Sequence, residues 1–146
     1  MGYTSIVCGV TASANAQKAA LDAAALAKQH NATLIYVYAV DIGFLRGSVG
    51  GMSTSLAGDG LERLGGHILS YAAELAQSQG VTPKKIVRHG AALEVLKQVI
   101  LEEKADLLVL GHEERTFFEK ALFKGNVEDH VEELKTLTGA EVTVIK

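Results

Sequence analysis

Short runs of apolar and β-branched residues alternate along the chain with longer segments in which apolar residues recur every three or four positions. The short runs are typical of buried strands, and the longer segments are typical of amphipathic helices. The pattern predicts strands at residues 4–10, 32–40, 84–88, 106–110 and 141–146. It predicts helices at residues 15–29, 61–79, 92–104 and 126–136.

Strand and helix alternate from the first element to the last. Such alternation produces a parallel sheet whose right-handed crossovers place helices on both faces. The nearly continuous apolar run at residues 32–40 agrees, because a strand that is covered on both faces lacks a polar side. We therefore expect one α/β domain over residues 1–146, with an open, Rossmann-like sheet of five parallel strands.

Two of the predicted helices differ in the apolar residues that they offer to a sheet. Residues 15–29 are rich in alanine, which lets a helix lie close to its neighbours. In residues 61–79 the side chains at helical spacing are larger, and we expect them to face the sheet. They are Leu61, Leu64, Ile68, Tyr71, Ala72 and Leu75.

Residues 41–60 interrupt the pattern with six glycines among serines and threonines. Loops of this length are uncommon inside compact domains unless they serve a function. The segment has no GxxxxGK[ST] motif, so a phosphate loop is not expected there. We interpret it as a lid or interface arm that becomes ordered when a ligand or partner binds.

The composition narrows the classes of function. The chain of 146 residues has a net charge of −3 and no basic stripe, so nucleic-acid binding is not expected. No signal peptide is visible and the apolar runs are too short to cross a bilayer, which favours a cytoplasmic protein without membrane insertion. The lone Cys8 fits a reducing compartment, and its apolar neighbours indicate a buried structural thiol.

Candidate catalytic chemistry is sparse. The five histidines show no metal-ligand spacing, and no metal site is predicted. No nucleophile and base are arranged in a recognisable pattern, so we do not expect an enzyme. A slow nucleotide hydrolase is the least favoured function. A flavodoxin-like electron carrier has a similar topology, but residues 11–15 match its phosphate loop only in part.

A doubly wound sheet binds ligands at the carboxyl ends of its strands, where the direction of winding reverses. If the first strand is central, this point lies between the first and fourth strands. The loops at residues 11–14 and 111–124 then frame the site. Asp41 and Ile42, after the second strand, lie near enough to contact a ligand.

Two segments carry a resemblance to a known family. The sequence SIVCGVTAS at residues 5–13, followed by the alanine-rich helix, resembles the opening of universal stress proteins. The sequence ADLLVLG at residues 105–111 is similar to a well-marked segment of the same family. The resemblance implies the strand order 3-2-1-4-5, frequent dimers and, in one branch, ATP or AMP in the crevice described above.

The family's nucleotide motif is present here only in part. Nucleotide-binding members carry an aspartate where this chain has Thr11, and a second glycine where it has Glu114. Gly111 matches, but one extra residue precedes Gly125, and Asn126 stands in place of serine or threonine. The resemblance and the topology together imply a weak site for AMP or ATP. The expected residues are Val10, Thr11, Ser13, Val40, Asp41, Gly111, His112, Arg115, Gly125 and Asn126.

The last predicted strand, at residues 141–146, lies at an edge of the sheet. An open edge invites pairing with another chain, and two copies can pair antiparallel about a two-fold axis. The resemblance implies the same homodimer. Two functions remain open: a stress-linked regulator that binds an adenine nucleotide, and an interaction protein that acts without a ligand.

Overall fold

The computed structural model describes residues 2–11, 14–40, 54–111 and 131–145, with side chains from residue 60 onward in the third range. Its strands are β1 (Ser5–Gly9), β2 (Thr33–Val40), β3 (Lys84–His89), β4 (Leu107–Gly111) and β5 (Glu141–Ile145). Its helices are α1 (Ala14–His30), α2 (Thr54–Ser78), α3 (Ala92–Glu103) and α5 (Val131–Thr138). The predicted elements are confirmed in type and order, and the predicted start of the last helix at residue 126 lies outside the described residues.

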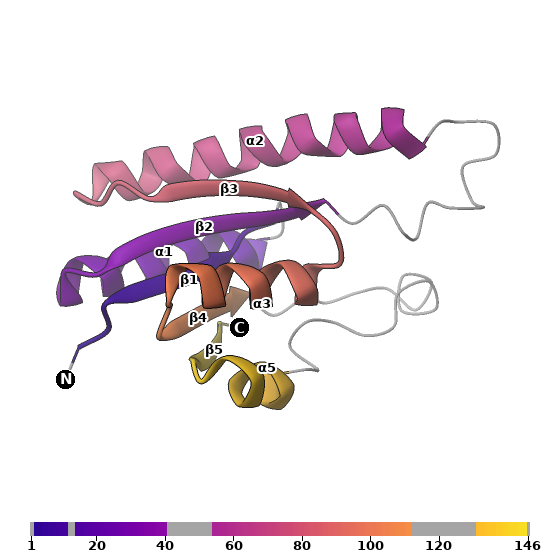
Figure 1. The fold of residues 1–146 in the computed structure, drawn as a ribbon. Helices are drawn as coiled ribbons and strands as arrows, with labels where there is room; N and C mark the ends of the chain where they lie inside the picture. The colour runs from indigo at the N-terminus through magenta and orange to yellow at the C-terminus, as the bar shows by residue number, and fades with distance from the viewer. Residues whose placement is uncertain (1, 12–13, 41–53, 112–130, 146) are drawn as a thin grey trace.

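The strands form one parallel sheet in the order β3-β2-β1-β4-β5, which confirms the predicted fold class and strand order. β1 is central: its Val7 lies opposite Ile35 of β2 on one side and Leu108 of β4 on the other. In Figure 1 α3 and α5 lie in front of the sheet, α1 lies behind it, and α2 runs beside β3.

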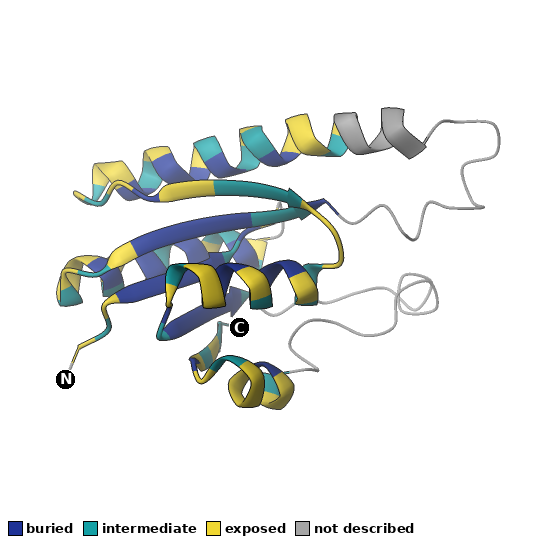
Figure 2. Cartoon of the chain, in the orientation of Figure 1, coloured by how far each residue is buried: buried dark blue, intermediate teal, exposed yellow. Residues whose placement is uncertain are grey.

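Successive side chains of the central strands point to opposite faces and build two cores. Those that face α1 and α2 include Ile6, Cys8, Leu34, Tyr36, Leu107 and Val109. Those that face α3 and α5 include Val7, Ile35, Val37, Leu108 and Leu110. Figure 2 shows the resulting band of buried strand residues between the helices. Each fully buried aliphatic side chain contributes about 1.5–3 kcal/mol, so the two cores together dominate the stability of the fold.

The alanine face of α1 lies close to the sheet, as predicted. Its buried residues are all alanines, at positions 16, 19, 20, 23, 24 and 27. This approach allows the buried Tyr36 of β2 to donate a hydrogen bond of 2.6 Å from its hydroxyl to the backbone oxygen of Ala20. Burial raises the pKa of Tyr36, so the hydroxyl stays protonated and available as a donor.

Helix α2 differs from the prediction in its start and in its inner face. The helix begins at Thr54 rather than at residue 61, because extending a formed helix adds hydrogen bonds without a new nucleation cost and so tolerates Gly58 and Gly60. Leu64 and Tyr71, which were expected to face the sheet, are 48% and 58% exposed. Ala72 is buried as predicted, and the other buried positions in the described part of α2 are Gly65, Leu69, Ala73 and Ala76.

A contact between Gly65 and Tyr38 explains why small residues face the sheet. The ring of Tyr38 on β2 lies against Gly65, and a Cβ at that position would be 2.3 Å from the Cδ1 atom of the ring. The sheet therefore fills the space between the layers with its own aromatic side chain. Large side chains such as Leu64 and Tyr71 lie instead around the side of the helix, whereas Leu69 is buried one turn beyond Gly65.

Asp106 ties the amino ends of β1 and β4 together. Its carboxylate accepts hydrogen bonds from the backbone N–H of Thr4 at 3.0 Å and of Ser5 at 3.1 Å. The Thr4 hydroxyl donates a further bond of 3.2 Å. Partial burial acts to raise the pKa of Asp106, but these hydrogen bonds outweigh it and hold the pKa below its usual value.

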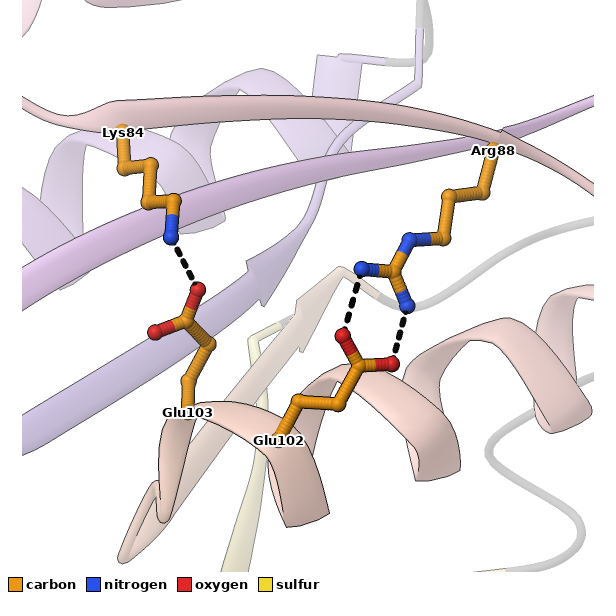
Figure 3. Close-up of polar contacts among 4 residues, drawn as sticks. All are labelled: Lys84, Arg88, Glu102 and Glu103. Carbon is orange, nitrogen blue, oxygen red and sulfur yellow. Dashed lines mark hydrogen bonds and ion pairs between the residues drawn. The ribbon is translucent and has the colours of Figure 1, made fainter.

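Two ion pairs join the edge strand β3 to α3 (Figure 3). Arg88 binds Glu102 through two bonds of 2.5 and 2.7 Å, and Lys84 pairs with Glu103. The hydrogen bonds from Arg88 lower the pKa of Glu102. Exposed pairs of this kind add little stability, but the forked geometry orients the strand on the helix.

The Asp106→Asn variant tests the carboxylate at the amino ends of the strands. An amide can accept at one atom only and turns N–H groups toward the donors, so we expect a loss of about 1–2 kcal/mol in the free energy of unfolding at pH 7. The folded state lowers the pKa of Asp106, so its carboxylate contributes fully to the free energy of unfolding above the ordinary aspartate pKa of about 4. This contribution disappears as the pH falls through the lower pKa of the folded state. Urea unfolding at pH 7 and at pH 3 measures the difference. Asp22→Asn on α1 is the control, and an equal pH effect in both variants would contradict the assignment.

The Gly65→Ala and Gly66→Ala variants test the close contact with Tyr38. The added methyl group at Gly65 meets the ring, and we expect destabilisation by about 1–3 kcal/mol. At Gly66 no atom lies within 4 Å of the added Cβ, so the gain in helix propensity should stabilise the protein by up to about 1 kcal/mol. Thermal unfolding distinguishes the two, and equal shifts would argue against tight packing at Gly65.

Candidate functional site

The carboxyl ends of β1 and β4 meet where the winding of the sheet reverses. The chain passes from β1 toward β2 and β3 on one side, whereas β4 and β5 lie on the other. Topology therefore places the ligand crevice at this edge. Val10 continues β1, and its N–H donates a bond of 2.9 Å to the Val37 oxygen. Thr11, the next residue, is exposed.

Gly111, at the end of β4, lies directly against the first turn of α1. A Cβ on Gly111 would be 2.5 Å from the backbone nitrogen of Ala16 and 2.6 Å from the backbone oxygen of Asn15. Only glycine permits this approach of two backbones. The contact joins the end of β4 to the first turn of α1, and packing alone is enough to require a glycine there.

The start of α1 contributes an electropositive surface to the same edge. The first N–H groups of a helix lack partners within it, and their dipoles add to a partial positive charge. The first turn of α1 contains no acidic residue to offset this charge. Near Gly111, this edge is lined by backbone atoms of Asn15 and Ala16.

Gln17 fixes the position of Thr11. Its Nε2 atom donates a bond of 2.7 Å to the backbone oxygen of Thr11, while its Oε1 atom is buried and has no hydrogen-bond partner. The sequence interpretation missed this residue because a glutamine on an amphipathic helix is normally a surface residue. Its position next to the buried Ala16, on the inner side of α1, was the available signal.

Val40 contributes an apolar side chain, and no polar one, to the candidate site. Its side chain is buried, and its backbone oxygen accepts a bond of 3.0 Å from the N–H of Gly90. Val40 lies three residues beyond Val37, which is opposite Gly9 of β1, so it belongs to the carboxyl edge. Of the predicted site residues, the structure brings Val10, Thr11, Val40 and Gly111 to this edge. The others lie outside the described residues: Ser13, Asp41, His112, Arg115, Gly125 and Asn126.

The remaining reactive groups do not form a second chemical site among the described residues. Cys8 is buried, as predicted, and desolvation raises the pKa of its thiol far above neutrality, so it is not a reactive thiolate. Within the same part of the chain, no three histidine, cysteine or acidic side chains gather where a metal ion could be held. No described helix has the length and apolarity to span a membrane.

A hollow of about 340 Å³ lies at the opposite, amino end of β2 and β3. Lys28, Asn31, Gly80 and Lys84 are among its lining residues. The C-termini of α1 and α2 end beside it, and the partial negative charge of a helix C-terminus disfavours an anion. The lysines there balance these helix ends.

Comparison with known proteins identifies a family and a fold. The sequence profile of the universal stress protein family matches residues 2–135, whereas no curated protein matches the chain significantly. The universal stress protein UspA from Lactobacillus plantarum has 19% identity and a TM-score of 0.79, with 100% of this chain and 99% of that chain covered.

Two similar structures hold adenine nucleotides. A universal stress protein in complex with cAMP has 22% identity and a TM-score of 0.69, with 100% of this chain and 98% of that chain covered. The universal stress protein from Archaeoglobus fulgidus in complex with dAMP has 17% identity and a TM-score of 0.64, and both chains are covered over 100% of their length. At these identities the solved structures establish the fold alone. Since the family profile spans nearly the whole sequence, this chain belongs to the universal stress protein family.

Proposed function

We propose that this chain is a regulatory protein that binds an adenine nucleotide of the AMP class at the carboxyl ends of β1 and β4. The observation that carries the proposal is the contact of Gly111 with the first turn of α1, which lines this edge with backbone groups. Two family members bind cAMP and dAMP, which are adenine nucleotides with one phosphate each. AMP, cAMP and ATP are therefore the ligands to compare.

A monophosphate suits the residues of this chain better than a triphosphate does. Thr11 offers one hydroxyl where nucleotide-binding members offer a carboxylate, so the nucleoside is held more weakly. Glu113 and Glu114 follow β4 in the sequence, and their charges oppose additional phosphates. A ligand with less negative charge meets less repulsion. The expected affinity is weak, and AMP should bind at least as tightly as ATP.

The wider proposal is a cytoplasmic, stress-linked homodimer that has no catalytic activity of its own. β5 pairs with β4 along one edge, and no other described strand pairs with its outer edge, which can pair antiparallel with a second copy. In this scheme nucleotide binding at the carboxyl edge changes the surface that the dimer presents to a protein partner. A slow nucleotide hydrolase is the lesser alternative.

A specific observation favours a second function, that of an interaction protein without a ligand. Thr11 is exposed, and its side chain lacks the carboxylate that nucleotide-binding members carry at this position. Glu114 likewise replaces a glycine of their motif. A chain that has lost both groups can retain the fold and the dimer while it no longer binds a nucleotide.

The decisive experiment separates these two functions. Freshly purified protein is denatured and the released small molecules are identified by mass spectrometry, and the intact protein is titrated calorimetrically with AMP, cAMP and ATP. We expect an adenine monophosphate to be released, or to bind with a measurable heat. No released nucleotide and no heat at millimolar concentrations would establish the interaction protein instead.

The Thr11→Asp variant tests the position of the nucleoside. A carboxylate restores a charged acceptor at the end of β1, and one such hydrogen bond should tighten AMP binding about tenfold. Titration calorimetry measures the change. Thr82→Asp, at the amino end of β3, is the control and should leave the affinity unchanged. No gain in Thr11→Asp would place the nucleoside elsewhere.

The Gln17→Leu variant tests whether Gln17 positions the loop after β1. The leucine removes the donor to Thr11 together with a buried, unpartnered oxygen, so the free energy of unfolding should stay the same or rise. AMP affinity should fall severalfold because the Thr11 backbone is no longer held. Gln29→Leu, at the exposed end of α1, is the control. A variant that loses stability but keeps its affinity for AMP would show that Gln17 contributes to packing and does not position the loop.

A further inference from the structure

The outer side of α2 carries a second apolar stripe that meets the core only in part: Ile68 packs against the core, whereas Leu64 and Tyr71 are exposed. Leu64 and Tyr71 are 48% and 58% exposed, and Leu61, Ile68 and Leu75 are half-buried beside them. In Figure 2 exposed and half-buried positions run along the outer side of the described part of α2. We define these five residues as the outer stripe. Large apolar side chains that gather on one surface mark an interaction site.

The spacing of the outer stripe is that of a helix that pairs with another helix. Successive members are separated by three, four, three and four positions. A 3-4 alternation keeps apolar side chains on a seam that faces a second helix, as in coiled coils. The inner face of α2 has different residues, so the helix can contact the sheet and another helix at the same time.

Charged residues beside the outer stripe indicate the direction of the second helix. Arg63, His67 and Glu74 lie in one row at helical spacing, basic toward the N-terminal end and acidic toward the C-terminal end. Each of the three is exposed, and none pairs with another described residue. A second α2 in the same direction would place Arg63 against Arg63 and Glu74 against Glu74. An antiparallel α2 places opposite charges together.

We propose that the outer stripe binds the outer stripe of a second copy of this chain, with the two α2 helices antiparallel. A two-fold axis near Ile68 sets Leu64 against Tyr71 of the second copy, and Leu61 against its Leu75. The same axis sets Arg63 against Glu74 of the second copy. Apolar and charged rows thus become self-complementary about one axis, as a two-fold interface requires.

This contact is separate from the pairing of β5. α2 lies beside β3, at the opposite end of the sheet from β5. Both surfaces can therefore be occupied together, and dimers joined through β5 would associate further through α2. The α2 contact does not depend on nucleotide binding.

Sedimentation of the full-length protein over a range of concentrations tests the contact. We expect Leu64→Glu and Tyr71→Glu each to weaken one self-association step at least tenfold. Leu101→Glu is the matched control, because Leu101 on α3 is 50% exposed but lies outside the stripe. Circular dichroism confirms that each variant is folded. A wild-type protein that does not associate through α2, or equal effects of all three variants, would overturn the proposal.

A charge exchange tests the antiparallel direction. Arg63→Glu alone and Glu74→Arg alone should each weaken the association, since each leaves two like-charged contacts in the dimer. The double variant Arg63→Glu with Glu74→Arg should restore it. Loss without restoration overturns the antiparallel arrangement.

Cross-linking provides a measurement that does not depend on affinity. When the Arg63→Cys and Glu74→Cys proteins are mixed, a short thiol cross-linker should join unlike chains in preference to like chains. The native Cys8 is buried and does not compete. Preferential joining of like chains would show a parallel contact and overturn the proposal.

Discussion

The close approach of helices to the sheet through small residues is the constraint on which the rest of this structure depends. Alanines on α1 bring that helix against β1 and β4, and a glycine with alanines on α2 brings that helix against β2 and β3. The sheet fills the remaining space with two tyrosines. Tyr36 reaches the backbone of α1, and Tyr38 lies on Gly65. Larger side chains of α2 such as Leu64 and Tyr71 lie to the side, where they form part of the outer stripe.

The same close packing shapes the candidate site. Gly111 brings β4 into backbone contact with α1, and Gln17 reaches from α1 to hold the loop after β1. Among the described residues, the edge is thus built from backbone contacts. This explains why a site can retain its form although the family's aspartate has become Thr11. It also explains why such a site should be weak.

The sequence predicted the strands and their alternation well, because apolar runs such as residues 32–40 belong to strands covered on both faces. The placement of Thr11 and Gly111 at one edge followed from topology. The inner face of α2 could not be predicted, since Leu64 and Tyr71 have the spacing of core residues and the space they would need is occupied by Tyr38. Gln17 was missed because its burial and its bond to Thr11 depend on tertiary contacts.

The hydrogen bonds of Asp106 have a consequence for how this protein can change over evolution. They fasten β1 to β4 at the amino ends of the strands, whereas the candidate ligand edge lies at the carboxyl ends. The hydrogen bonds that hold β1 and β4 together and the candidate ligand site thus lie at opposite ends of the same two strands. Substitutions in the recognition loops can accumulate at little cost in folding free energy, so a lineage can gain, weaken or exchange a ligand while it inherits the scaffold intact.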